Sequence, residues 1–146
     1  MKISEILQNR KLSVSFEIFP PKQDSAYDAV IGCADELARY KPDFISVTYG
    51  AGGGTSANTV RIASHIQEIG VTPLAHLTCL SSTKREVRAI IDELKIRGIE
   101  NVLALRGDRP KDAAVATPGD YAHADDLIRD IKAAGDFCVG GACYPE

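Results

Sequence analysis

The sequence predicts an α/β fold built on a parallel sheet, because strand-like and helix-like segments alternate along almost the whole chain. Five apolar segments have the length and composition of buried strands, and the segments between them repeat apolar residues at helical spacing. Strands separated by helices of this length need right-handed crossovers, which make the sheet parallel. With 146 residues and 45% apolar content, the chain suits one domain over residues 1–146.

The first half of the chain contains three of the expected strands. Residues 13–19 form a strand that stops at Pro20 and Pro21, because proline cannot donate to a ladder. Side chains alternate between the faces of a strand, so Glu17 points away from the apolar side that Phe16 occupies. The elements expected next are a helix over 25–40, a strand over 44–49, a helix over 57–69 and a strand over 73–79.

The second half begins with the clearest capping signals. Thr83 and Glu86 fit a capping box, an apolar stripe follows, and Gly98 ends the helix before a strand over 101–105. The other elements expected are a helix over 121–134 that Gly135 closes, a strand over 137–144, and a short amphipathic helix within 1–10.

Composition excludes several classes of function. The net charge of −3 comes from interspersed acids and bases, and no basic stripe indicates a nucleic-acid partner. No apolar run has the roughly 18 residues that a membrane span needs, and the N-terminus lacks a signal-peptide pattern. We therefore expect a cytoplasmic protein.

Four cysteines and three histidines give no metal-ligand spacing. Cys33, Cys79, Cys138 and Cys143 fall on apolar faces or strands without a Cys-x-x-Cys pair, which favours reduced packing residues over a metal or redox site. The histidines His65, His76 and His123 are spaced irregularly, and no Ser-His-Asp order stands out.

Polar groups follow every expected strand. In parallel α/β folds the carboxyl ends of the strands form the rim where ligands bind, so this repetition predicts a site at that rim. Each group has a structural alternative: Glu17 as a solvated edge residue, His76 as a hydrogen-bonded core histidine, and Asp108 as a loop cap paired with Arg106. The groups are Glu17, Thr48-Tyr49-Gly50, His76 with Thr78, Arg106-Gly107-Asp108 and Tyr144-Pro145-Glu146.

These segments resemble the successive signature segments of the methylenetetrahydrofolate reductase family. The resemblance covers nearly the whole chain, with Cys143 standing where the family usually has alanine. The segments are Ser15-Phe16-Glu17-Ile18-Phe19-Pro20-Pro21-Lys22, Ser46-Val47-Thr48-Tyr49-Gly50-Ala51, Ala75-His76-Leu77-Thr78-Cys79, Ala104-Leu105-Arg106-Gly107-Asp108 and Ala142-Cys143-Tyr144-Pro145-Glu146.

The resemblance implies a (β/α)8 TIM barrel that binds FAD and takes a hydride from NADH or NADPH. Its substrate would be 5,10-methylenetetrahydrofolate, reduced to 5-methyltetrahydrofolate in one-carbon metabolism and methionine synthesis. Glu17 would be the general acid that helps open the folate ring, and Asp108 would favour the cationic iminium. The FAD-contacting positions implied are Thr48, Tyr49, Ala51, His76, Arg106, Gly107, Asp108, Tyr121, Ala122 and Tyr144.

The departure from the family is length. A TIM barrel takes about 250 residues, so we expect a partial barrel truncated after the fifth strand, with open edges that favour a homo-oligomer or dependence on a partner. Three interpretations stay open: a reductase of this family, a non-catalytic remnant or partner subunit, and another flavin barrel of the proline-dehydrogenase type.

Overall fold

The computed structural model describes residues 1–21, 23–49, 56–108 and 119–142, and these form one five-stranded sheet. The strand order is β1-β2-β3-β4-β5, and every neighbouring pair is parallel. Sequential parallel strands joined by helices are the arrangement of a barrel segment, which confirms the predicted fold class: an α/β sheet consistent with a partial TIM barrel. The strands are β1 (Ser15–Ile18), β2 (Phe44–Val47), β3 (Pro73–Thr78), β4 (Asn101–Leu105) and β5 (Cys138–Gly141).

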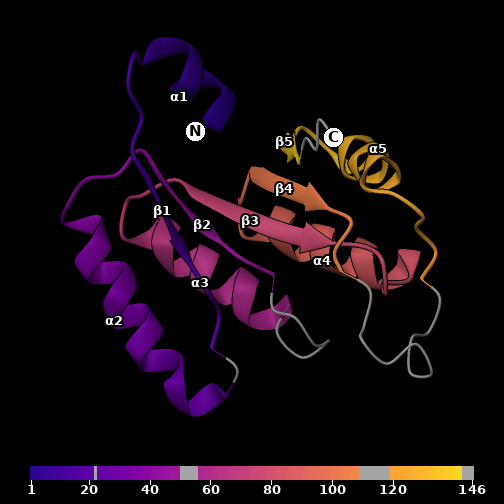
Figure 1. The fold of residues 1–146 in the computed structure, drawn as a ribbon, viewed down its shortest axis with the longest axis horizontal. Helices are drawn as coiled ribbons and strands as arrows, with labels where there is room; N and C mark the ends of the chain where they lie inside the picture. Colours follow the sequence, from indigo (N-terminus) through magenta and orange to yellow (C-terminus); the bar gives the residue numbers. More distant parts are fainter. Residues whose placement is uncertain (22, 50–55, 109–118, 143–146) are drawn as a thin grey trace.

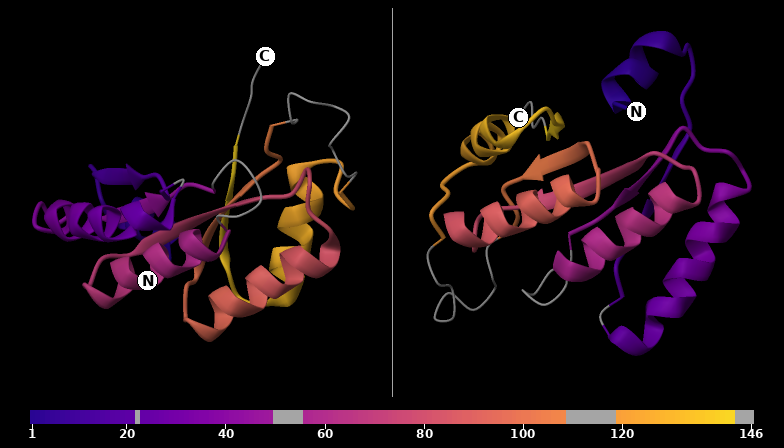
Figure 2. Two further views of the ribbon diagram at one scale, coloured as in Figure 1. Left: turned by 90° about the horizontal axis from the view of Figure 1, so that it is seen from below. Right: turned by 180° about the vertical axis from the view of Figure 1, so that it is seen from behind.

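Four helices follow one another along one face of the curved sheet, while α1 lies apart from them near the start of the strands (Figures 1 and 2). A short 3-10 turn, Asp24–Ala26, precedes the first of the four. Among the described residues no helix is long and apolar enough to cross a membrane. The helices are α1 (Ile3–Asn9), α2 (Tyr27–Ala38), α3 (Ser56–Glu68), α4 (Lys84–Ile96) and α5 (Ala124–Ala134).

The hydrophobic core lies between the sheet and these four helices. Alternate residues of each strand enter it, as Ile45 and Val47 of β2 do, both with no exposed surface. Helix residues such as Ile66, Ile91 and Leu127 cover them from the other side. Each such side chain contributes about 1.5–3 kcal/mol by leaving water, so this face of the sheet is fixed toward the helices. The intervening residues must occupy the opposite face.

Capping explains why α4 begins where the sequence predicts. Thr83 Oγ1 accepts a hydrogen bond from Glu86 N at 3.2 Å, and Glu86 Oε2 accepts one from Thr83 N at 2.8 Å. Hydrogen bonds from Thr83 lower the pKa of Glu86. At the other end Gly98 has a φ of 69°, a conformation that glycine adopts without strain.

The expectation that Cys33 packs on the apolar face of α2 is wrong, because its side chain is exposed. The buried stripe instead passes through Ala34, which has no exposed surface and lies one residue further round the helix. The predicted start of the last helix is also early: α5 begins at Ala124. Tyr121 packs beside that helix, since its hydroxyl donates to Asp130 at 2.7 Å.

Helix α1 is anchored to the start of β4 by the buried side chain of Asn101, which is 2% exposed. Asn101 Oδ1 accepts a hydrogen bond from Ile3 N at 2.8 Å, and its Nδ2 donates to Met1 O at 3.0 Å and Pro73 O at 3.3 Å. The N-cap residue of α1, Lys2, makes no cap hydrogen bond to the helix through its side chain. Asn101, at the start of β4, therefore supplies the hydrogen-bond acceptor that the backbone N–H groups in the first turn of α1 need.

We predict that Asn101→Ala lowers the free energy of unfolding by about 2–3 kcal/mol, because it leaves buried backbone groups without partners. Urea titration followed by circular dichroism measures this change. Asn9→Ala is the matched control, since the Asn9 side chain donates to Glu5 O at an exposed position, and its effect should stay within about 0.5 kcal/mol. Equal losses in the two variants would contradict the anchoring role.

Candidate active site at the inner face of the sheet

Glu17 lies on the sheet face opposite the core, with its neighbours Phe16 and Ile18 packed under the helices. Its side chain is 48% exposed. The parallel register places Glu17 directly beside Ser46 of β2, and side chains of paired residues share a face. The prediction that Glu17 is directed away from the apolar layer is confirmed by this packing.

Two buried polar side chains surround the Glu17 carboxylate. Ser46, which is 7% exposed, donates from Oγ to Glu17 Oε2 at 3.2 Å and lies 3.4 Å from Phe16 O. His76 of β3 is 8% exposed, and its Nε2 lies 3.7 Å from the same Oε2. Burial lowers the pKa of His76, although the nearby Glu17 charge opposes this effect. The imidazole is therefore predominantly neutral at pH 7.

The residues that follow β2 are fixed by backbone contacts. Thr48 N donates to Ile18 O at 3.0 Å, and Thr48 O accepts from Thr59 Oγ1 at 3.0 Å. These bonds tie the end of β2 both to β1 and to α3. Tyr49 comes next and packs partly buried against the core. Both residues thus stand at the carboxyl end of the sheet, where the sequence predicts them.

The turn after β4 packs directly on the end of β3. Arg106 O accepts hydrogen bonds from Cys79 N at 3.3 Å and Leu80 N at 2.8 Å. Gly107 has a φ of 84°, and a Cβ there would lie 3.1 Å from the Thr78 Cβ. Glycine is required by both the conformation and the close approach. The Arg106 side chain is exposed and forms no ion pair with another described residue.

The remaining predicted site residues show no contact with Glu17, Ser46 or His76 in the described part of the chain. Tyr121 is 4% exposed, and burial followed by the bond to Asp130 raises its pKa, so its hydroxyl already has a partner. Ala122 and Asp108 are exposed. Ala51 and Tyr144 lie outside the described residues. The structure therefore brings Glu17 and His76 together, whereas Tyr121 is held in the core beside α5.

Ser46 is the site residue that sequence reasoning missed. Ser46 belongs to one of the sequence segments that resemble the family, within the strand predicted over 44–49. A small polar residue is common in a strand, so its type alone did not indicate a role at the site. The available signal was the period of two: Ser46 precedes Thr48 by two residues and so shares its face. The cross-strand register that joins it to Glu17 follows only from the structure.

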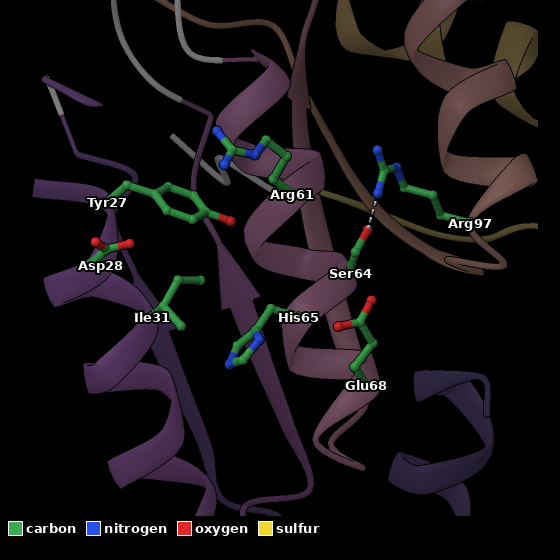
Figure 3. A pocket seen from close by; sticks show the side chains of 8 residues that line it. All are labelled: Tyr27, Asp28, Ile31, Arg61, Ser64, His65, Glu68 and Arg97. Atoms are coloured by element: carbon green, nitrogen blue, oxygen red, sulfur yellow. Dashed lines mark hydrogen bonds between the residues drawn. The ribbon is translucent and has the colours of Figure 1, made fainter. Parts of the chain in front are cut away.

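A concavity lies on the helical side of the molecule, away from Glu17. This groove of about 300 Å³ runs between α2 and α3, and Arg97 at the end of α4 closes one side (Figure 3). The Arg61 guanidinium stacks 4.0 Å from the Tyr27 ring, and Arg97 Nη1 donates to Ser64 Oγ at 3.4 Å. The two arginine side chains of this groove are thus already in contact with other side chains of the chain. No group of three potential metal ligands occurs in the described part of the chain.

Comparison with known proteins gives one consistent result. The family model described as methylenetetrahydrofolate reductase matches residues 2–146. The chain belongs to the methylenetetrahydrofolate reductase family. This membership decides against a flavin barrel of the proline-dehydrogenase type, and the resemblance stated from the sequence segments is confirmed.

Curated relatives of this family are similar over nearly the whole chain. "Methylenetetrahydrofolate reductase (NADH) 1" of Arabidopsis thaliana is 38% identical over 99% of the chain and 25% of that protein. "5,10-methylenetetrahydrofolate reductase" of Pectobacterium carotovorum is 38% identical over 96% of the chain and 46% of that protein. The Escherichia coli protein of the same name is 37% identical, with 93% and 45% covered. The chain thus spans a quarter to a half of these reductases.

We predict that His76 makes this reductase-family chain less stable as the pH falls from 7 to 5. The pKa of His76 is lower in the folded chain than its ordinary value of 6.5, so the unfolded chain takes up a proton first. The stabilisation is fully present above the ordinary value and declines below it. Urea titrations across this range should show a shallower pH dependence for His76→Gln than for the unchanged chain. Identical slopes would contradict the burial effect.

Proposed function

We propose that this chain takes part in the FAD-dependent reduction of 5,10-methylenetetrahydrofolate to 5-methyltetrahydrofolate, with NADH or NADPH as the electron donor. The observation that carries this proposal is the Glu17 carboxylate on the inner sheet face, in contact with buried Ser46 and His76. Family membership supports the substrate, and the plant relatives named for NADH support a nicotinamide donor. We also propose that the protein is cytoplasmic and acts in one-carbon metabolism and methionine synthesis.

The residues at the strand ends fit a flavin dinucleotide. Arg106 offers an exposed guanidinium without an ion-pair partner among the described residues, which suits a diphosphate. Gly107 lets the turn that carries Arg106 pack closely on Thr78, which fixes the backbone beside the proposed FAD site. We propose that FAD is held by Thr48, Tyr49, Ala51, His76, Arg106, Gly107, Asp108, Tyr121, Ala122 and Tyr144. FAD, when bound, would carry reducing equivalents from the nicotinamide to the folate.

Glu17 would supply a proton to the folate. In the substrate one methylene carbon bridges two nitrogens, and cleavage of one carbon–nitrogen bond leaves an iminium at the other. The Glu17 carboxylic acid donates its proton to the departing nitrogen as that bond breaks, so no nitrogen anion has to form. Glu17 ends as a carboxylate.

The surroundings of Glu17 suit this proton transfer electrostatically. The iminium is a cation, and the carboxylate that Glu17 becomes carries a charge that favours it, to which we propose that the exposed Asp108 adds when the folate is bound. His76, whose burial keeps it predominantly neutral, adds little positive charge to oppose the iminium. A protonated histidine at the same 3.7 Å from Oε2 would instead favour the Glu17 carboxylate and hinder proton donation.

We predict that Glu17→Gln slows reduction of the folate by about 10²-fold or more, the scale of a lost general acid. Reduction of FAD by the nicotinamide should stay nearly unchanged, because it needs no proton from this side chain. Stopped-flow absorbance of the two half-reactions separates these steps. Equal slowing of both would assign Glu17 a structural role.

We predict that Arg106→Ala weakens FAD binding by about tenfold, because a charge-assisted contact to the diphosphate is lost. Flavin fluorescence titration gives the dissociation constant. Arg85→Ala is the control, since Arg85 is exposed on α4, on the helical side. An unchanged dissociation constant for Arg106→Ala would remove Arg106 from the proposed FAD site.

A further inference from the structure

We propose that Ser46 is a positioning residue for Glu17, holding one carboxyl oxygen so that the other faces the folate. This inference rests on the proposed function, because it assigns Ser46 a part in the same proton transfer. Neither the family match nor the names of the relatives assigns Ser46 a role. The juxtaposition that carries the inference is the cross-strand pair Glu17 and Ser46, with His76 on the next strand.

The first argument is that the Ser46 hydroxyl has to find a partner inside the protein. Only 7% of the residue is exposed, and buried hydroxyl groups in folded proteins are hydrogen-bonded. Its single proton has two acceptors within reach, Phe16 O at 3.4 Å and Glu17 Oε2 at 3.2 Å. The carboxylate is the closer acceptor and, when ionised, the stronger one. The geometry therefore directs the proton of Ser46 to Glu17.

The second argument is that Glu17 needs an external constraint. Its side chain is 48% exposed and has three rotatable bonds, so its packing alone does not fix the carboxyl. Ser46 and His76 both approach Oε2, at 3.2 and 3.7 Å. Oε1 has no hydrogen-bond or ion-pair partner among the described residues. One carboxyl oxygen is thus held by the protein and the other is left for proton transfer.

The third argument is that a hydroxyl serves both protonation states of the acid. Ser46 donates to Oε2 while Glu17 is a carboxylate, and it can keep donating to Oε2 when the acid proton is on Oε1, because Oε2 is then still a hydrogen-bond acceptor. A lysine or arginine at this position would favour only the carboxylate. A neutral donor is the partner that a general acid can keep through its whole cycle.

The test compares Ser46→Ala with Ser46→Thr in the FAD-loaded protein. Ser46→Ala should slow the folate half-reaction about tenfold, the scale of one lost hydrogen bond to a charged group, and leave flavin reduction within about twofold of the unchanged protein. Ser46→Thr keeps the hydroxyl on a side chain suited to strands, and should recover most of the rate. Ser64→Ala is the matched control, because Ser64 is 8% exposed and its hydroxyl donates to Val60 O and accepts from Arg97 on the helical side, away from Glu17.

A double-mutant cycle shows whether Ser46 acts through Glu17. In the Glu17→Gln background the further change Ser46→Ala should slow the folate half-reaction by less than about twofold, since the acid to be positioned is already gone. A tenfold loss in both backgrounds would show that Ser46 acts independently, and would overturn the inference.

A measurement without catalysis tests the same contact. Carbon-13 relaxation of the Glu17 side-chain methylenes in the chain itself should show lower order parameters for Ser46→Ala than for Ser46→Thr. Unchanged order parameters in Ser46→Ala would overturn the inference. Failure of the proposed function is distinct, because it would appear as an unimpaired folate half-reaction in Glu17→Gln.

Discussion

The burial of one sheet face under four helices is the constraint on which the rest of the structure depends. Because strand side chains alternate strictly, fixing Ile45, Val47 and their equivalents toward the helices leaves no choice for the residues between them. Glu17, Ser46 and His76 are on the face opposite the helices for this reason. A shift of one residue in β1 would send Glu17 into the apolar layer, where a carboxylate without a partner is costly. The position of the acid is thus enforced by apolar contacts that it does not make.

Burial also divides the polar residues of the site into two kinds. Ser46 and His76 are nearly inaccessible, and their contacts to Oε2 are part of the folded structure. Arg106 and Asp108 are exposed, and their side chains have no hydrogen-bond or ion-pair partner among the residues that the structure describes. The turn that carries them is nonetheless fixed, because Arg106 O bonds to two amides at the end of β3. The rigid backbone lowers the entropy that binding would cost, whereas the exposed side chain of Arg106 would still lose freedom when a ligand orders it.

Local patterns predicted the sheet, the helix order and the capping box of α4, because each depends on neighbours in the sequence. Strand β4 occurs over the residues that the apolar run predicts, Asn101–Leu105. The errors have a different origin. Cys33 and Ala34 are both small and compatible with the apolar stripe of α2, so only packing decides which is buried. The contact of Ser46 with Glu17 depends on strand register, and the role of Asn101 depends on a partner near the N-terminus. Neither leaves a trace in a short window of sequence.

The anchoring of α1 has a consequence for the order of folding. The contact between Ile3 N and Asn101 Oδ1 closes a loop of 98 residues, although α1 is synthesised well before β4. At about 5–20 residues per second, the ribosome delivers its acceptor roughly 5–20 seconds later. An isolated helix of 7 residues is too short to persist in water during that interval. We therefore expect the N-terminal segment to stay unstructured during that interval. It can dock only after the strands as far as β4 have assembled.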